Sequence, residues 1–316
     1  MTTAVVFGYH NVGVRCLSVL LAHEVEVKLV VTHDDAPGEN IWFGSVRDLA
    51  HAHDIPVIAP ADPHEAKAFA RIAAMKPDYI FSFYYRQMLK PEMLKLAKLG
   101  AYNMHGSLLP KYRGRVPINW AVIKGEKETG ATLHEMVTKP DAGRIVDQMP
   151  VPILANDTAK DVFDKVLVAA EIVLARSIEP LVAGVAKHTP MELEKGSYFS
   201  GRKPEDGRIP WTAPAQLVHD LVRGVSKPYP GAFSDLPVGR LIVWRTLPVL
   251  KPSEGPPALF VEGNDLFARC GDGHALKILS ADLAGEPFTV DKFHARFGSR
   301  VLPLPLHAPI APKAVS

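Results

Sequence analysis

The sequence has few cysteines, almost no net charge and no long apolar segment. Only Cys16 and Cys270 occur among its 316 residues, and their separation fits neither a CxxC pair nor a metal-binding spacing. Lysine and arginine total 36 against 34 aspartates and glutamates, which gives a formal net charge of +2. That balance lacks the dense positive field of a dedicated nucleic-acid-binding protein. No apolar run is long enough to span a bilayer, so we expect no membrane insertion.

The amino terminus and the composition predict a cytoplasmic globular enzyme. The opening stretch, MTTAVVFGYH, has no basic region before its short apolar run, so we expect no signal peptide. Hydrophobic residues make up 47% of the chain and charged residues 22%, which is ordinary for a globular protein. A chain of 316 residues is long enough for two domains, each with its own core.

The first half alternates strand-like and helix-like segments. This alternation predicts an α/β fold with a doubly wound, mostly parallel sheet. The expected strands are residues 4–8, 24–32, 56–58, 79–83 and 101–104. Beyond Gly125 the pattern predicts an antiparallel pair at 131–137 and 145–151, followed by a long helix at 158–182.

The last third is rich in proline and glycine and carries short apolar runs, which predicts a small β-barrel or sandwich. The runs are residues 241–244, 258–261, 266–270 and 276–278. The final stretch, LPLPLHAPIAPKAVS, has too many prolines for a stable element and is expected to trail along the surface. We therefore expect a catalytic domain over residues 1–200, a β domain over 201–305 and a proline-rich tail over 306–316.

The turn after the first expected strand, GYHNVGVR, does not carry a standard nucleotide motif. Gly8 and Gly13 are separated by four residues with no third glycine, which excludes the GxGxxG fingerprint of NAD enzymes. Val14 and Arg15 stand where a P-loop needs Lys and Ser or Thr. The turn, which includes Tyr9, can approach a ligand or can simply be a tight strand–helix connection.

The stretch NMHGSLLPKYRGR places Asn103 and His105 at the end of a strand. Residues two apart in a strand point to the same face, so the two side chains can converge on one point. A fixed amide donor and a proton-transfer group are what acyl-type transfer requires. The alternative is a strand end whose polar residues only meet water. A second strand end, FSFYYRQML, adds two tyrosines that pack in the core or face a ligand.

A third segment, KPDAGRIVDQ, contributes Asp141. A carboxylate near His105 can orient the imidazole and raise its pKa, because opposite charge favours the imidazolium form. Asp141 can equally be a solvated turn residue. His134 is a rival imidazole that ranks second, because it lies within an expected strand. No group of His, Cys, Asp and Glu has metal-ligand spacing, so we expect no metal.

Taken in order, these motifs resemble the signature of the folate-dependent formyltransferase family. The signature consists of Asn103-x-His105, the run from Ser107 to Gly114, TGATLH at 129–134 and Asp141-Ala-Gly143. Within that family the chain most resembles the formyltransferase half of the bifunctional enzyme that makes UDP-4-deoxy-4-formamido-L-arabinose. The stretches concerned are PGENIWFGSV, FSFYYRQML, NMHGSLLPKYRGRVPINW and KPYPGAFS. The resemblance implies a Rossmann-like formyltransferase domain and an OB-like C-terminal barrel, without the NAD-dependent second half.

The resemblance also implies a role for individual residues. His105 would be the general acid/base, Asn103 would stabilise the oxyanion, and Asp141 would tune His105. The donor would be 10-formyltetrahydrofolate, without NAD or metal, and its contacts would be Gln87, Met88, Leu89, Arg115, Val137, Thr138, Lys139 and Pro140. The acceptor would be a UDP-amino sugar contacted by Tyr9, Ser107, Lys111, Arg113 and Arg202. The implied biological role is lipid A modification and polymyxin resistance.

Three alternatives stay open at this point. The first is methionyl-tRNA formyltransferase, which performs the same chemistry on a nucleic acid. The loop HDDAPGENIWFG argues against it, because it holds Asp34, Asp35 and Glu39 but no lysine or arginine. The second is a formyltransferase for another nucleotide-linked amino sugar. The third is a catalytically silent folate- or sugar-nucleotide-binding module. The oligomeric state is not predicted.

Overall fold

The structure is a computed structural model that describes residues 1–307. Backbone contacts divide the chain into two compact units, and each unit is built from segments that are not contiguous in the sequence. The first unit comprises residues 1–114, 129–151 and 164–198. The second comprises residues 115–128, 152–163 and 199 onwards.

The first unit is organised around a seven-stranded sheet with the order β3-β2-β1-β4-β5-β7-β8. Its strands are β1 (Thr3–Gly8), β2 (Glu26–Val31), β3 (Val57–Ile58), β4 (Tyr79–Phe83), β5 (Gly100–His105), β7 (Glu128–Glu135) and β8 (Ile145–Pro152). The pairings from β3 to β5 are parallel, whereas β5 and β7 are antiparallel. The carboxyl ends of five parallel strands therefore meet at one edge of the sheet, where ligands bind in open α/β folds.

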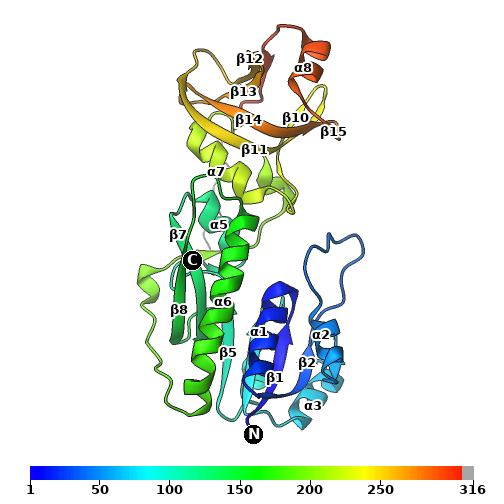
Figure 1. Ribbon diagram of the computed structural model, residues 1–316, viewed down its shortest axis with the longest axis vertical. Coiled ribbons are helices and arrows are strands. Elements are labelled where there is room, and N and C mark those ends of the chain that lie inside the picture. The colour runs from blue at the N-terminus through cyan, green and yellow to red at the C-terminus, as the bar shows by residue number, and fades with distance from the viewer. Residues whose placement is uncertain (308–316) are drawn as a thin grey trace. The chain divides into compact units, whose positions relative to one another are not determined.

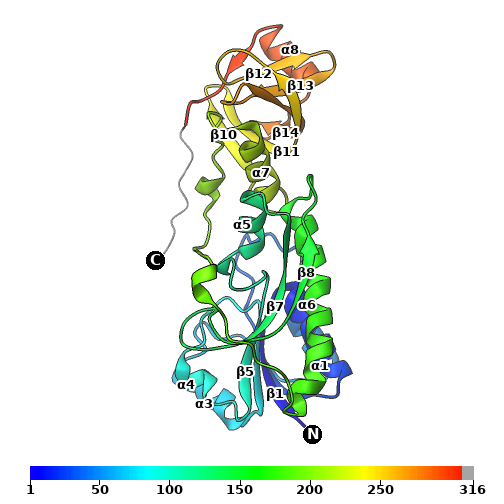
Figure 2. The same cartoon turned by 90° about the vertical axis from the view of Figure 1, so that its left-hand side faces the viewer.

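Helices cover both faces of this sheet. Figure 2 shows α1 and α6 on one face and α3 and α4 on the other. The helices of this part of the chain are α1 (His10–Ala22), α2 (Val46–Ala52), α3 (Ala66–Ala74), α4 (Pro91–Leu94) and α6 (Ala159–Val182). On the α3/α4 face, Phe7 and Ile80 of the strands pack with Ile72 and Met93 of the helices. Burial on both faces explains why these strands are almost continuously apolar.

The second unit contains a curled antiparallel sheet with the order β10-β11-β14-β13-β12-β16, to which β15 is attached through β14 (Figure 1). Its strands are β10 (Ala232–Leu236), β11 (Gly239–Pro252), β12 (Ala258–Glu262), β13 (Asp265–Arg269), β14 (His274–Leu283), β15 (Glu286–Pro287) and β16 (Leu302–Pro303). The helices of this unit are α5 (Pro117–Ile123), α7 (Ala215–Val225) and α8 (Val290–Phe297). Its core is formed around the fully buried Trp211, with Val218 and Val222 of α7 and Phe293 of α8.

Short elements complete the fold. The two-residue strands β6 (Arg113–Gly114) and β9 (Tyr198–Phe199) pair with each other, and 3₁₀ turns lie at Leu193–Lys195 and Pro204–Gly207. None of the helices in the described part of the chain is long and apolar enough to cross a membrane.

The predicted fold class is confirmed, and so is the long helix, which was expected at 158–182 and begins one residue later. The expectation for the last fifteen residues is wrong at their start. Leu302 and Pro303 form strand β16, which pairs with Leu259 and Ala258 of β12. A proline is compatible with this position because β16 lies at the sheet edge, where its missing N–H is not needed by a further strand. Residues 308–316 of the predicted tail lie outside the described residues.

Asp78 joins the beginnings of two neighbouring strands in the first unit. Its carboxylate accepts hydrogen bonds from the Thr3 backbone N–H at 2.9 Å and the Thr3 hydroxyl at 2.8 Å, and Lys98 Nζ lies at 3.0 Å. These donors, the Thr3 N–H first among them, lower the pKa of Asp78 to about 2.

We expect Asp78→Asn to destabilise the protein by about 2 kcal/mol at pH 7. The folded-state pKa is depressed, so this contribution is complete above pH ~4 and is lost as pH falls toward 2. Denaturant unfolding at pH 7 and pH 3 measures both quantities, and the gap between wild type and variant should shrink at pH 3. Glu65→Gln is a control, because Glu65 is exposed and makes no capping hydrogen bond to α3. An equal gap at both pH values would contradict the prediction.

Candidate active site

Three polar side chains converge where β5 ends. β5 pairs with β7 in a register that sets Asn103 opposite His134 and His105 opposite Thr132. Directly opposed residues in an antiparallel pair share a face and have neighbouring Cβ atoms. Alternation along β5 places His105 on that same face. The β5/β7 ladder therefore brings one amide and two imidazoles together.

Asn103 is held by a neutral imidazole. His134 Nδ1 lies 2.8 Å from the Glu135 carbonyl, which can only accept, so Nδ1 carries the proton. His134 Nε2 is then the acceptor for the Asn103 side-chain N–H at 3.1 Å. His134 is 1% exposed, and burial lowers its pKa to about 4. The ring thus stays neutral at ordinary pH and fixes the Asn103 carboxamide in one orientation.

Asp141 lies between the two imidazoles. One carboxylate oxygen, Oδ1, is 3.7 Å from His105 Nδ1 and 3.6 Å from His134 Nε2. The other, Oδ2, accepts the Gly114 backbone N–H at 2.8 Å. Asp141 has a left-handed backbone with φ of 48°, a conformation that aspartate adopts more readily than most residues. The carboxylate is therefore anchored at one oxygen and presented to the histidines by the other.

The loop that carries Asp141 is fixed against β7 at Gly143. A Cβ atom at Gly143 would lie 2.0 Å from the Glu135 carbonyl oxygen, so only glycine allows this approach. The next residue, Arg144, binds the Glu135 carboxylate through two hydrogen bonds of 2.7 Å. A backbone contact and a bidentate ion pair together position the loop relative to His134.

The segment after His105 folds back and closes the site with its own hydrogen bonds. His105 Nε2 donates to the Tyr112 carbonyl at 2.8 Å. The Ser107 hydroxyl donates to the Lys111 carbonyl at 2.7 Å, and Thr132 Oγ1 donates to the Ser107 carbonyl at 2.6 Å. Ser107 is fully buried, so its hydroxyl acts inside the loop, whereas the Lys111 side chain is exposed.

Arg113 is a buried cation next to this site. It is 8% exposed, and its neighbour Gly114 is the residue that anchors Asp141. Its Nε atom is buried and makes no hydrogen bond, and within residues 1–307 no carboxylate lies at ion-pair distance. Its guanidinium carbon lies 5.9 Å from the Tyr198 ring. A buried charge without a counter-charge is costly, and an anionic ligand would relieve that cost.

The turn after β1 is a tight, well-packed connection. Tyr9 is buried at the start of α1, and its hydroxyl donates to Asp35 Oδ1 at 2.5 Å. The guanidinium of Arg86 lies 4.4 Å from the Tyr9 ring centroid and pairs with Glu39. Arg47 pairs with Asp34. All three carboxylates of the acidic loop at 33–44 therefore have partners within the protein.

The residues expected to contact folate have different environments. Gln87 Nε2 donates to the Ala61 carbonyl at 2.6 Å, the Met88 side chain is 59% exposed, and Leu89 belongs to the core beside α4. In the loop before Asp141, the exposed side chains are Val137, Thr138 and Lys139, and Pro140 is half-buried. Arg115 and Arg202 belong to the second unit; Arg115 is exposed, and Arg202 packs over Trp120 at 4.6 Å.

The structure brings the predicted Asn103, His105 and Asp141 together. Sequence reasoning named His134 only as a rival imidazole, not as the group that holds Asn103, and it did not name the Gly114 N–H. The TGATLHE pattern could have indicated this role of His134, because a strand antiparallel to β5 can place one of its residues opposite Asn103. No signal in the sequence points to Gly114, since its contribution is a backbone N–H. Among the described residues there is no group of three or more His, Cys, Asp and Glu that could hold a metal ion.

An amide N–H, an imidazole and a carboxylate at the carboxyl edge of a doubly wound sheet are a set of groups that can support acyl-type group transfer. Comparison with known families agrees with this assignment. The formyl transferase family matches residues 16–178, and its C-terminal domain matches residues 202–297. The chain belongs to the formyl transferase family and is a formyltransferase, as the sequence motifs predicted.

Solved structures share its fold. An N-formyltransferase from Helicobacter canadensis, in complex with folinic acid and dTDP-3-aminofucose, has 21% identity and a TM-score of 0.69 over 91% of this chain and 100% of that one. WlaRD, a sugar 3N-formyl transferase crystallised with dTDP and 5-N-formyl-THF, has 20% identity and a TM-score of 0.69 over 88% and 97%. HypX from Aquifex aeolicus with tetrahydrofolic acid has 18% identity and a TM-score of 0.62 over 94% of this chain but 47% of HypX.

We predict that His134 makes stability fall as the solution becomes acidic. Its folded-state pKa lies below that of an exposed histidine, so the contribution of the neutral ring is complete above pH ~6.5 and is lost between pH ~6.5 and ~4. In this window the wild type should lose up to about 3 kcal/mol more of its unfolding free energy than His134→Gln. Denaturant unfolding at several pH values measures the slopes. His53→Gln, at an exposed position, should keep the wild-type slope, and identical slopes for all three proteins would refute the assignment.

Proposed function

We propose that this formyltransferase moves the formyl group of 10-formyltetrahydrofolate to the 4-amino group of UDP-4-amino-4-deoxy-L-arabinose. The observation that carries the proposal is the convergence of Asn103, His105 and Asp141 at the end of β5. Family membership supports formyl transfer, and the relatives bound to folinic acid and to a dTDP-amino sugar support a folate donor and a nucleotide-sugar acceptor. The biological role would then be modification of lipid A and resistance to polymyxin.

In the proposed reaction the acceptor amine attacks the formyl carbon and a C–N bond forms. Negative charge collects on the formyl oxygen of the tetrahedral intermediate, where a preorganised N–H stabilises it. The Asn103 carboxamide has two N–H groups, and one of them is bound to His134 Nε2. The second N–H is the donor to the oxyanion, and the neutral His134 ring fixes its direction.

His105 carries out the proton transfers of the proposed reaction. The attacking amine becomes a substituted ammonium and must lose H⁺, while the folate N10 must gain H⁺ as its bond to the formyl carbon breaks. A single side chain that takes the first proton and delivers the second balances the reaction. His105 Nδ1 faces Asp141 Oδ1 at 3.7 Å, so the carboxylate stabilises positive charge on the ring during the transfer.

Arg113 supports an acceptor that carries phosphate. Its guanidinium is buried, has no carboxylate partner in the described part of the chain and adjoins the residue that anchors Asp141. A diphosphate supplies the missing counter-charge, and the exposed Lys111 adds a second cation. For the donor, we propose the segments at 87–89 and 137–140 together with Arg115.

The rival acceptor, methionyl-tRNA, fits these observations less well. A tRNA-binding surface needs several exposed cations along the phosphate backbone. The loop at 33–44 offers carboxylates instead, and they are already paired with Arg47, Tyr9 and Arg86. A silent binding module would not need an oriented amide beside an imidazole–carboxylate pair.

We expect His105→Ala and Asn103→Ala each to lower formyl transfer by about 10²-fold or more, the scale of general acid–base and oxyanion contributions. Transfer of label from 10-formyltetrahydrofolate to the amino sugar measures the rate. His53→Ala, an exposed histidine on the same unit, serves as the matched control. Thermal unfolding should confirm that the variants remain folded, and wild-type turnover in either folded variant would eliminate the mechanism.

We also predict that the sugar nucleotide is preferred to tRNA. In a direct competition, UDP-4-amino-4-deoxy-L-arabinose and initiator methionyl-tRNA are supplied together with labelled 10-formyltetrahydrofolate. Label should enter the sugar, and raising the salt from 50 to 200 mM should weaken the reaction only modestly, because two phosphates release few counterions. Label in the tRNA, with a steep loss of activity as salt rises, would instead assign the enzyme to tRNA.

A further inference from the structure

The segment that follows β4, residues 85–90, is here called the donor segment because it contains the proposed folate contacts at 87–89. It is neither helix nor strand, and it leaves the sheet beside the end of β5, since Phe83 pairs with Met104 in the parallel ladder. In the part of the chain that the structure describes, no backbone–backbone hydrogen bond holds residues 85–89. The shape of the donor segment therefore depends on side chains that bind its backbone.

His33 binds the first part of the donor segment. Its Nε2 atom accepts the Arg86 backbone N–H at 3.0 Å, so this nitrogen carries no proton. The His33 ring also stacks on the Tyr85 ring, with centroids 4.1 Å apart and an interplanar angle of 17°. Burial, followed by the positive charge of Arg86, lowers the pKa of His33, which favours the neutral ring. One imidazole thus contacts two consecutive residues of the segment.

His64 binds the second part of the donor segment. Its Nε2 atom lies 3.0 Å from the Met88 carbonyl, which can only accept, so this nitrogen carries a proton and donates. The Lys90 backbone N–H lies farther from the same nitrogen, at 3.4 Å, and cannot be accepted while Nε2 is protonated. The backbone N–H of His64 donates to Asp62 Oδ1 at 2.9 Å, which helps to fix the histidine itself. One histidine therefore holds an N–H of the donor segment, and the other holds a carbonyl.

These anchors leave other groups of the donor segment available. Gln87 Nε2 donates to the Ala61 carbonyl at 2.6 Å, which ties the segment to the loop that carries His64. The Met88 side chain is 59% exposed, and the backbone N–H groups of Met88 and Leu89 have no acceptor among residues 1–307. A segment that is already ordered binds a ligand more tightly than a flexible one, because less conformational entropy is lost on binding.

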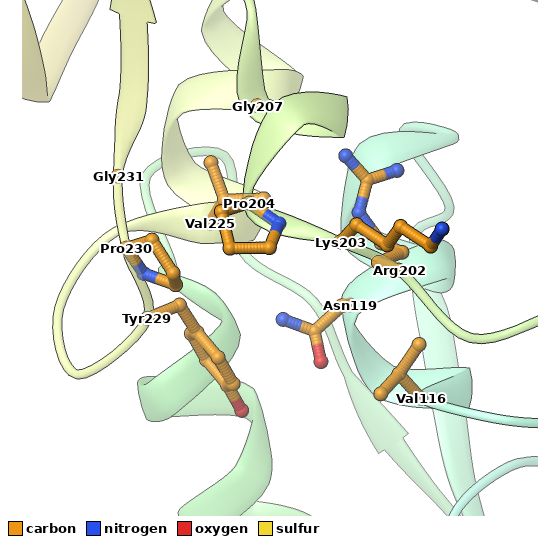
Figure 3. Close-up of a pocket in the computed structure, with 10 residues that line it drawn as sticks. All are labelled: Val116, Asn119, Arg202, Lys203, Pro204, Gly207, Val225, Tyr229, Pro230 and Gly231. Atoms are coloured by element: carbon orange, nitrogen blue, oxygen red, sulfur yellow. The ribbon is translucent and has the colours of Figure 1, made fainter. Parts of the chain in front are cut away.

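A cavity of the second unit is another place where a flat ring could bind, and Figure 3 shows its residues. Tyr229 presents an aromatic side chain there, and the walls include Val116, Val225 and Pro230. The volume of this cavity is about 140 Å³, which is close to the space that holds one benzene molecule. The two fused rings of a pteridine need more room, so the cavity is a less suitable site for the folate than the donor segment.

We propose that His33 and His64 are positioning residues of the folate site, each holding the donor segment by one hydrogen bond in the shape that binds the formyl donor. This inference rests on the proposed donor contacts at 87–89. It goes beyond them because neither histidine was among the residues expected to contact the folate. All the groups involved belong to the first unit.

Glutamine and leucine variants separate hydrogen bonding from packing. Glutamine offers an oxygen to the Arg86 N–H and an N–H to the Met88 carbonyl, whereas leucine offers neither. In calorimetric titration of the full chain with 5-formyltetrahydrofolate, His33→Leu and His64→Leu should each weaken binding about tenfold, the scale of one lost hydrogen bond whose partner is left unpaired. His33→Gln and His64→Gln should stay within about threefold of the wild type. His53→Leu, at an exposed position, is the matched control and should bind like the wild type.

Turnover gives a second measurement. Both leucine variants should raise KM for 10-formyltetrahydrofolate and leave KM for the amino-sugar acceptor unchanged. Thermal unfolding should show which variants are folded. His64 lies at a half-buried loop position, so His64→Leu and His64→Gln decide the test if His33→Leu does not fold.

Four outcomes would overturn the inference. They are wild-type folate affinity in both leucine variants, an equal loss of affinity in the glutamine and leucine variants, a loss confined to Tyr229→Leu, and a wild type that does not bind 5-formyltetrahydrofolate. The third would place the folate in the cavity of the second unit, and the fourth would also refute the donor contacts at 87–89. The expected pattern of folate binding in a protein that formylates no UDP-sugar would refute the proposed acceptor and uphold the roles of His33 and His64.

Discussion

The active-site geometry depends on the cross-strand pair of Asn103 and His134. The amide can be aimed only while His134 Nε2 accepts its N–H, and Nε2 can accept only while the ring is neutral. Burial provides that neutrality, and the Glu135 carbonyl fixes the tautomer. Asp141, 3.6 Å away, favours the charged ring, so the hydrophobic surroundings of β7 must outweigh a nearby carboxylate. Desolvation has the larger effect on the His134 pKa, so packing around β7 helps to hold the proposed oxyanion donor in place.

The arginines near the described sites differ in whether they have a carboxylate partner. Several arginines near the described sites have carboxylate partners, among them Arg86 with Glu39 and Arg144 with Glu135. Arg113 in the first unit is buried and Arg202 in the second is half-buried, and neither has a carboxylate at ion-pair distance among residues 1–307. Stability alone would favour pairing or replacing such residues. Under the proposed function, an anionic ligand would offset this electrostatic cost at Arg113.

Much of this architecture was readable from the sequence. The alternation of strands and helices predicted the sheet, because parallel strands are buried on both faces and read as apolar runs. The spacing of Asn103 and His105 predicted that they share a face, because side chains alternate along a strand. The sequence pattern could not predict the register between neighbouring strands. Only the β5/β7 pairing sets His134 opposite Asn103, and only a folded loop brings the Gly114 N–H to Asp141. Strand β16 was missed because proline content was weighed without knowing that the segment lies at a sheet edge.

Gly143 has a consequence for how this enzyme tolerates sequence change. It touches no proposed substrate and carries no reactive atom, yet its α-carbon lies so close to the Glu135 carbonyl that even a methyl group must displace the loop. A displacement of that kind would move Asp141 away from the two histidines, although all the proposed catalytic side chains would still be present. Replacing Gly143 with even a small residue such as alanine would therefore displace the loop and disturb the candidate site, although no functional group would be removed.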